Sequence, residues 1–113
     1  MTSMTREELI ANLKQKLGVQ EGTEVDLQGN GYAMVIATEP EEVTEELVGR
    51  LQSLKAKKDV RRMIAIPPKA TVMHAAREKT QGTGIGVMDG RGFIIKPFSW
   101  SLYRSVPLGT YKG

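Results

Sequence analysis

The fold is decided by the stretch YAMVIATEPEEVTEELVGRLQSLKAKKDVRRMIAI, which spans residues 32–66. It begins with a continuous apolar run, YAMVIA (32–37), which is typical of a strand buried on both faces at the centre of a sheet. It ends within RRMIAIP (61–67), a short apolar strand that Pro67 and Pro68 end. Between them, apolar residues recur at helical spacing, at Val43, Leu47, Leu51 and Leu54. Such a strand–helix–strand unit predicts two parallel strands joined by a right-handed crossover.

The charges between the two runs match the dipole of one helix over residues 39–59. Pro40 suits its first turn, where acidic residues are also favoured, and the far end is basic. The acidic residues are Glu41, Glu42, Glu45 and Glu46, and the lysines are Lys55, Lys57 and Lys58. We therefore interpret the acidic run as solvation of a helix and not as an acid/base pair.

The preceding residues predict a helix and a hairpin. TREELIANLKQKLG (5–18) opens with the capping-box pair Thr5 and Glu8 and ends at a glycine. TEVDLQ (23–28) and YAMVIA then read as two strands joined by the tight turn GNG (29–31).

The following residues predict a helix over KATVMHAAREKTQG (69–82) and two final strands, in TGIGVMD (83–89) and FIIKP (93–97). The glycine-rich run GTGIGVMDGRG (82–92) follows one helix and precedes no other. A phosphate-binding loop needs a helix directly after its glycines, so we interpret this run as the joint and turn of the last two strands.

Together these elements predict a single α/β domain over residues 1–97. Its order is α-β-β-α-β-α-β-β, with roughly five strands in a mixed sheet flanked by three helices. Residues 98–113 form an aromatic and basic tail, predicted to pack on the domain or to extend from it. In a chain with only six aromatic residues, we expect Phe93 and Trp100 to be buried and to close the core.

Composition excludes several function classes. The 113 residues contain no cysteine, and thus no disulfide, thiolate nucleophile or cysteine-ligated metal. They contain no apolar run long enough to span a membrane and no secretory signal at the start. We expect a cytoplasmic protein with no membrane contact and no cofactor.

The net charge of +3 conceals an asymmetry. Residues 1–46 carry three basic and ten acidic residues, a net −7, whereas residues 47–113 carry thirteen basic and three acidic residues, a net +10. The basic half either offers a footprint for a polyanion or neutralises the acidic half across one fold.

From about Val25 to Pro97 the chain resembles the second half of the restriction-endonuclease-like (PD-D/E-x-K) fold. The apolar strand, the long amphipathic helix, RRMIAIPPKA (61–70) and the short helix leading into GTGIGVMDGRG carry this resemblance, which implies a nuclease-like order of elements. That family places an Asp at the end of one strand and a Glu-x-Lys on the next, which together bind a divalent metal. Asp26 suits the first acid.

The Glu-x-Lys position falls on Ile36-Ala37-Thr38, and Glu39 lies one residue beyond. The resemblance therefore implies a fold with degenerate catalytic positions, and Mg²⁺ only if a displaced pair, Asp26 and Glu39, replaces the signature. The lone histidine, His74, fits a surface residue better than a metal ligand.

Two groups of residues remain as candidates for binding. The basic group comprises Lys55, Lys57, Lys58, Arg61 and Arg62, and the tail adds Tyr103, Arg104 and Lys112. Helix capping explains the lysines, but it explains the arginine pair less well. Basic residues with interleaved aromatics contact phosphates and stack on bases, or they anchor a protein interface.

Our leading hypothesis is a non-catalytic nucleic-acid-binding accessory protein of nuclease-like fold. The first alternative is a small protein–protein adaptor or self-assembling subunit, which uses its tail or an open sheet edge and has a protein partner or a second copy. The second alternative is a metal-dependent nuclease with the displaced pair.

Overall fold

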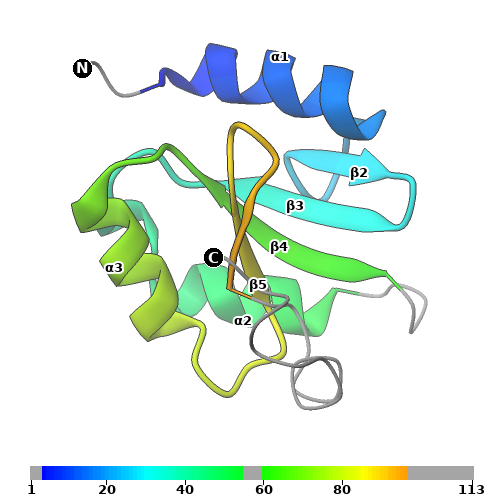
Figure 1. The fold of residues 1–113 in the computed structure, drawn as a ribbon. Coiled ribbons are helices and arrows are strands. Elements are labelled where there is room, and N and C mark those ends of the chain that lie inside the picture. The colour runs from blue at the N-terminus through cyan, green and yellow to red at the C-terminus, as the bar shows by residue number, and fades with distance from the viewer. Residues whose placement is uncertain (1–3, 55–59, 97–113) are drawn as a thin grey trace, which may run out of the picture.

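Six strands form one mixed sheet whose strand order follows the chain, from β1 to β6 (Figure 1). The computed structural model describes residues 4–54 and 60–96. Strands β1 to β3 are antiparallel, β3, β4 and β5 are parallel, and β6 returns antiparallel to β5. The strands are β1 (Gln20–Glu21), β2 (Leu27–Gly29), β3 (Tyr32–Ile36), β4 (Arg61–Ile66), β5 (Gly86–Asp89) and β6 (Ile94–Lys96).

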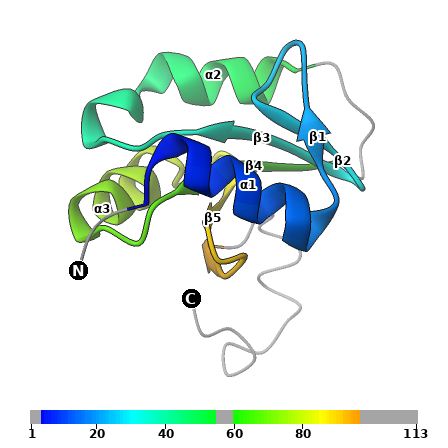
Figure 2. The ribbon, with the colours of Figure 1, turned by 90° about the horizontal axis from the view of Figure 1, so that it is seen from above.

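The helices cover both faces of this sheet. Helix α1 (Arg6–Leu17) lies on one face, and α2 (Glu45–Ser53) and α3 (Ala70–Lys79) lie on the other (Figures 1 and 2). Side chains alternate along a strand, so Met34 packs in the apolar cluster under α1 while its neighbour Val35 packs in the cluster under α2 and α3. The predicted single α/β domain, with a mixed sheet and three helices, is confirmed.

The sheet has one strand more than the roughly five that the sequence predicts. Strand β1 contains only Gln20 and Glu21, both exposed, and it pairs with β2 at the edge of the sheet. Two polar residues carry no alternating pattern, which explains why sequence reasoning missed this strand. No helix in the described ranges has the length and apolarity needed to cross a membrane.

The single helix predicted over residues 39–59 is wrong in extent. A short 3₁₀ turn (Pro40–Glu42) comes first, and the helical conformation is interrupted after it. Thr44 then caps α2, because its hydroxyl accepts a hydrogen bond from the Leu47 amide at 3.1 Å. Glu45 and Glu46 do lie in the first turn of α2, as predicted, but Glu41 and Glu42 precede the helix.

The predicted caps and turns are otherwise confirmed. Thr5 and Glu8 form the capping box of α1, and Gly18 ends that helix in the left-handed conformation. Asn30 and Gly31, with φ of 49° and 82°, join β2 to β3 as a type I′ turn does.

Candidate functional site

The parallel strands give the sheet two chemically different edges. The carboxyl ends of β3, β4 and β5 lie side by side at one end of the sheet. We call this row of strand ends, formed by residues 36–39, 66–69 and 89–91, the carboxyl edge. The amino ends of β3 and β4 meet at the opposite edge, formed by residues 31–33 and 60–62, which we call the amino edge. The acids singled out from the sequence lie at the carboxyl edge and the arginine pair lies at the amino edge.

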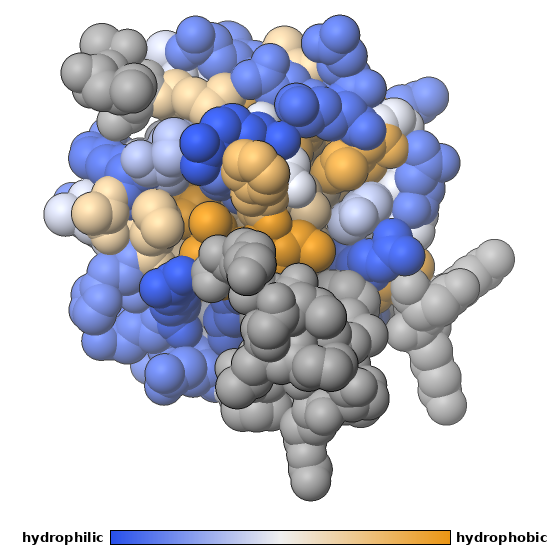
Figure 3. Space-filling model, viewed as in Figure 1, coloured by the Kyte–Doolittle hydropathy of each residue, from blue (hydrophilic) through white to orange (hydrophobic). Residues whose placement is uncertain are grey.

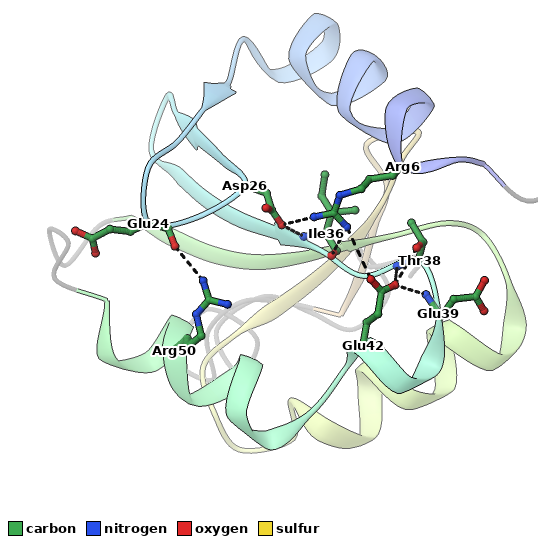
Figure 4. Close-up of polar contacts among 8 residues, drawn as sticks. All are labelled: Arg6, Glu24, Asp26, Ile36, Thr38, Glu39, Glu42 and Arg50. Atoms are coloured by element: carbon green, nitrogen blue, oxygen red, sulfur yellow. Dashed lines mark hydrogen bonds and ion pairs between the residues drawn. The ribbon is translucent and has the colours of Figure 1, made fainter.

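Asp26 precedes β2 and is engaged by the protein itself (Figure 4). Its Oδ2 accepts hydrogen bonds from the Ile36 amide at 2.8 Å and from Arg6 Nη2 at 3.1 Å. Arg6 also donates to the Ile36 carbonyl at 3.2 Å, so Asp26 and Arg6 together tie the start of α1 to the end of β3.

Glu42 holds the turn that follows β3 in the same way. Its Oε1 accepts hydrogen bonds from the amide and hydroxyl of Thr38, at 2.6 and 2.8 Å, and from the Glu39 amide at 2.7 Å. Burial raises the pKa of Glu42, but these hydrogen bonds and the nearby Arg6 outweigh it, so the pKa lies below its ordinary value of 4.5. Glu42 therefore caps a turn and is not merely solvated, contrary to the sequence prediction.

Each acid of the displaced metal pair is engaged by a cation of the protein. Glu39 Oε2 forms an ion pair with Lys69 Nζ at 3.1 Å, while Asp26 is bound to Arg6. The described ranges contain no group of three or more His, Cys, Asp or Glu side chains placed to hold a metal ion. A metal at either acid would have to displace a cation, and two-oxygen coordination would leave the ion poorly held.

Sequence reasoning missed Asp89, the fully buried carboxylate at the end of β5. Its Oδ1 accepts hydrogen bonds from the Arg91 and Phe93 amides at 2.9 and 3.1 Å. Its Oδ2 accepts from Arg91 Nε and Nη2 at 3.1 and 2.8 Å. Its position in the Asp-Gly pair of a predicted turn was the only sequence signal.

Asp89 also explains why the expected burial of Phe93 is wrong. The Gly92 amide donates to the Asp89 carbonyl at 3.0 Å, and Gly92 has a φ of 90°, so the backbone makes a tight turn here. Phe93 is 60% exposed, and the Arg91 guanidinium lies 5.0 Å from the centre of its ring. Trp100, which was also expected to be buried, lies outside the described residues.

The amino edge carries the first of the two predicted arginines on the α1 side of the sheet. Arg61 is paired in register with Tyr32, and its guanidinium lies 4.9 Å from the centre of the Tyr32 ring. Tyr32 packs against the cluster under α1. Arginine over an aromatic face is an arrangement that also stacks well against nucleobases.

Arg62 lies on the opposite face from Arg61. It is paired with Ala33, which packs under α2, and its Nη2 donates to the Leu54 carbonyl at the end of α2, at 2.9 Å. Its Nε is buried and has no hydrogen-bond partner among the described residues. Adjacent residues of a strand point to opposite faces, so the single basic group predicted from the sequence is divided between the two faces of the sheet.

The remaining predicted binding residues are not part of the described structure. Lys55, Lys57 and Lys58, between Leu54 and Val60, and the tail residues Tyr103, Arg104 and Lys112 lie outside the described residues. His74 is exposed on α3, 3.6 Å from Glu78, which agrees with the surface position expected for it.

A scan against protein-family models and searches of curated proteins and of solved structures found no match for this chain. The resemblance to the restriction-endonuclease-like fold therefore stays a prediction.

Proposed function

We propose that the protein is a non-catalytic nucleic-acid-binding accessory protein that contacts phosphates and bases at its amino edge. The observation that carries this proposal is the Arg61–Tyr32 stack, because it joins a guanidinium to an aromatic ring at the point where the basic half of the chain forms a strand. Arg62 adds a second guanidinium on the other face of the same edge.

The distribution of charge supports the same assignment. At the carboxyl edge, Asp26, Glu39 and Asp89 each face a cation, so these acids and bases neutralise each other. Within the described ranges, Arg62 at the amino edge donates to a backbone carbonyl and meets no carboxylate, so no acid there compensates its positive charge. A polyanion is attracted to such uncompensated charge.

The test is a salt titration of binding to labelled single- and double-stranded DNA and RNA. We expect the affinity to fall steeply with salt, and the double variant Arg61→Gln/Arg62→Gln to bind on the order of tenfold more weakly, with a salt slope reduced by about one to two. The matched control is Arg77→Gln/Lys79→Gln, which removes the same charge from the exposed end of α3. Absence of binding at low salt, or equal effects of both double variants, would overturn the proposal.

A second candidate function is self-association, and the exposed tip at Arg91 and Phe93 favours it. Phe93 is the exposed large hydrophobic residue of the described ranges, and it adjoins β6, an edge strand whose Ile94 and Ile95 are half-buried. Figure 3 shows hydrophobic residues gathered near the centre of one face of the molecule, with hydrophilic residues above and beside them. Asp89 neutralises Arg91, so this tip suits an apolar protein surface better than a polyanion.

The mass in solution tests this second function. We expect a mass above that of the monomer by light scattering, insensitive to salt, and a return to the monomer in Phe93→Ser. The control Phe93→Leu keeps an apolar side chain and should keep the association. A wild-type protein that is monomeric at high concentration would exclude this function.

A further inference from the structure

Two adjoining hollows lie on the α2 side of the amino edge. Their volumes are about 400 and 340 Å³, and both are lined by Thr23, Glu24 and Leu54. One wall is the loop before β2 and the other is the end of α2, where Arg50 Nη2 donates to the Glu24 carbonyl at 3.3 Å (Figure 4). Helix α2 ends at Ser53, and the hollows lie beside its last turn.

The lining combines an apolar floor with a polar rim. The buried side chains of Val25, Val35 and Leu51 line the larger hollow, and buried Ala33 lines the smaller. The rim contains the exposed residues Thr23 and Gln28. Concave sites of a few hundred Å³ with an apolar floor and a few polar groups suit small planar ligands, since the floor contacts the ring faces and the rim binds the polar edge.

Arg62 connects these hollows to the positive charge of the amino edge. It lies beside Ala33 in the sheet, and it donates to the carbonyl of Leu54, so it contacts the hollow at two of its lining residues. Its buried Nε has no partner, and a donor left without a partner at this depth costs free energy unless a ligand or water completes it. Arg61 stands on the other face of the same strand.

We propose that these hollows receive an unstacked base of single-stranded nucleic acid, while the neighbouring arginines contact its phosphates. This inference rests on the proposed function and adds the class of nucleic acid. Bases of a single strand can turn out of the stack into a hollow, whereas bases of a duplex are paired and held in the stack. The protein should therefore prefer single strands over duplexes of the same sequence.

The experiment compares a labelled 20-nucleotide single strand with its duplex, by fluorescence anisotropy on the full chain. Thr23→Trp places a large side chain on the exposed rim of both hollows, and its matched control is Thr71→Trp, at an exposed position on α3. We expect Thr23→Trp to bind the single strand at least tenfold more weakly and to bind the duplex within twofold of the wild type. Thr71→Trp should bind both as the wild type does. Circular dichroism and thermal unfolding check that both variants fold.

A second variant protects this test against an unexpected effect of the tryptophan. Gln28→Ala removes a polar group of the rim without adding bulk, and we expect it to bind the single strand about threefold to tenfold more weakly. Equal wild-type affinity for single strand and duplex, or unchanged single-strand binding by both variants, would overturn the inference. If the Arg61→Gln/Arg62→Gln variant still loses binding in that case, the proposed function stands and only the base site fails. A mononucleotide that binds as tightly as the 20-nucleotide strand would also overturn it, because the ligand would then be a free nucleotide.

Discussion

The two edges of the sheet use their charged residues for opposite purposes. At the carboxyl edge, each carboxylate that we singled out is bound to a cation of the same molecule, and these contacts tie α1, the 3₁₀ turn and the β5–β6 turn to the strand ends. At the amino edge, Arg61 lies on an aromatic ring and Arg62 donates to one carbonyl with its Nε unpartnered.

This difference separates structural charges from charges that can bind a ligand. Acids that look catalytic in the sequence, such as Asp26 and Glu39, stabilise the fold by pairing with neighbours. Arg62 forms no ion pair within residues 4–54 and 60–96, so its charge has attraction left for a polyanion. The chain therefore places its stabilising electrostatics at one end of the parallel strands and its candidate binding surface at the other.

The largest effect should come from Asp89→Ala. This change removes a fully buried carboxylate that accepts four hydrogen bonds, and it leaves the Arg91 and Phe93 amides without an acceptor. We expect the free energy of unfolding to fall by about 2–4 kcal/mol, measured by urea denaturation. Asp89→Asn, which keeps an acceptor oxygen, should lose less. A loss below about 1 kcal/mol for Asp89→Ala would show that the carboxyl edge does not depend on this group.

A smaller loss is expected for Asp26→Ala, since this carboxylate is partly exposed and accepts two hydrogen bonds. Its removal should lower the free energy of unfolding by about 1–2 kcal/mol and leave nucleic-acid affinity unchanged. Urea denaturation and the salt titration measure the two quantities. If the wild type cleaves nucleic acid with Mg²⁺ or Mn²⁺ and Asp26→Ala does not, Asp26 is catalytic and the division between the edges is wrong.

Arg62→Met tests whether the charges of the amino edge contribute less to the stability of the fold than those of the carboxyl edge. Methionine retains an apolar stem but cannot donate to the Leu54 carbonyl, which lowers the free energy of unfolding. It also removes the buried Nε that has no partner among the described residues, which raises the free energy of unfolding, so the two effects oppose each other. We expect a change in the free energy of unfolding within about 1 kcal/mol, together with weaker nucleic-acid binding. A loss above about 2 kcal/mol would place Arg62 among the structural charges.

Glu42→Gln should have the smallest effect of these changes, and one that depends on pH. The pKa of Glu42 in the folded protein lies below 4.5, so its carboxylate stabilises the fold above that pH. That stability is lost as the pH falls through the lowered folded pKa. The difference in stability between wild type and variant should therefore shrink toward zero as the pH falls from 7 to 3, as denaturation at each pH would measure. A difference independent of pH would mean that the charge of Glu42 is not what holds the turn.

Much of the fold follows from the sequence, because local rules decide it. Continuous apolarity predicted β3 at the centre of the sheet, a short apolar run predicted β4, and helical spacing with caps at Thr5 and Gly18 predicted α1. The position of the glycine-rich run after α3 marked the last two strands as a hairpin. The placement of Arg61 and Arg62 on opposite faces also follows from the sequence, because side chains alternate along any strand.

Only the tertiary structure decided the features that depend on distant partners. Asp26 is engaged because folding brings Arg6 and Ile36 to it, and Glu39 is paired because Lys69, directly before α3, lies beside it. Phe93 points outward because a buried Asp89 holds the turn around it. The hollows beside Leu54 exist because α2 ends where the loop before β2 approaches it. Periodicity and capping act over a few residues, whereas these contacts join segments that only the folded sheet brings together.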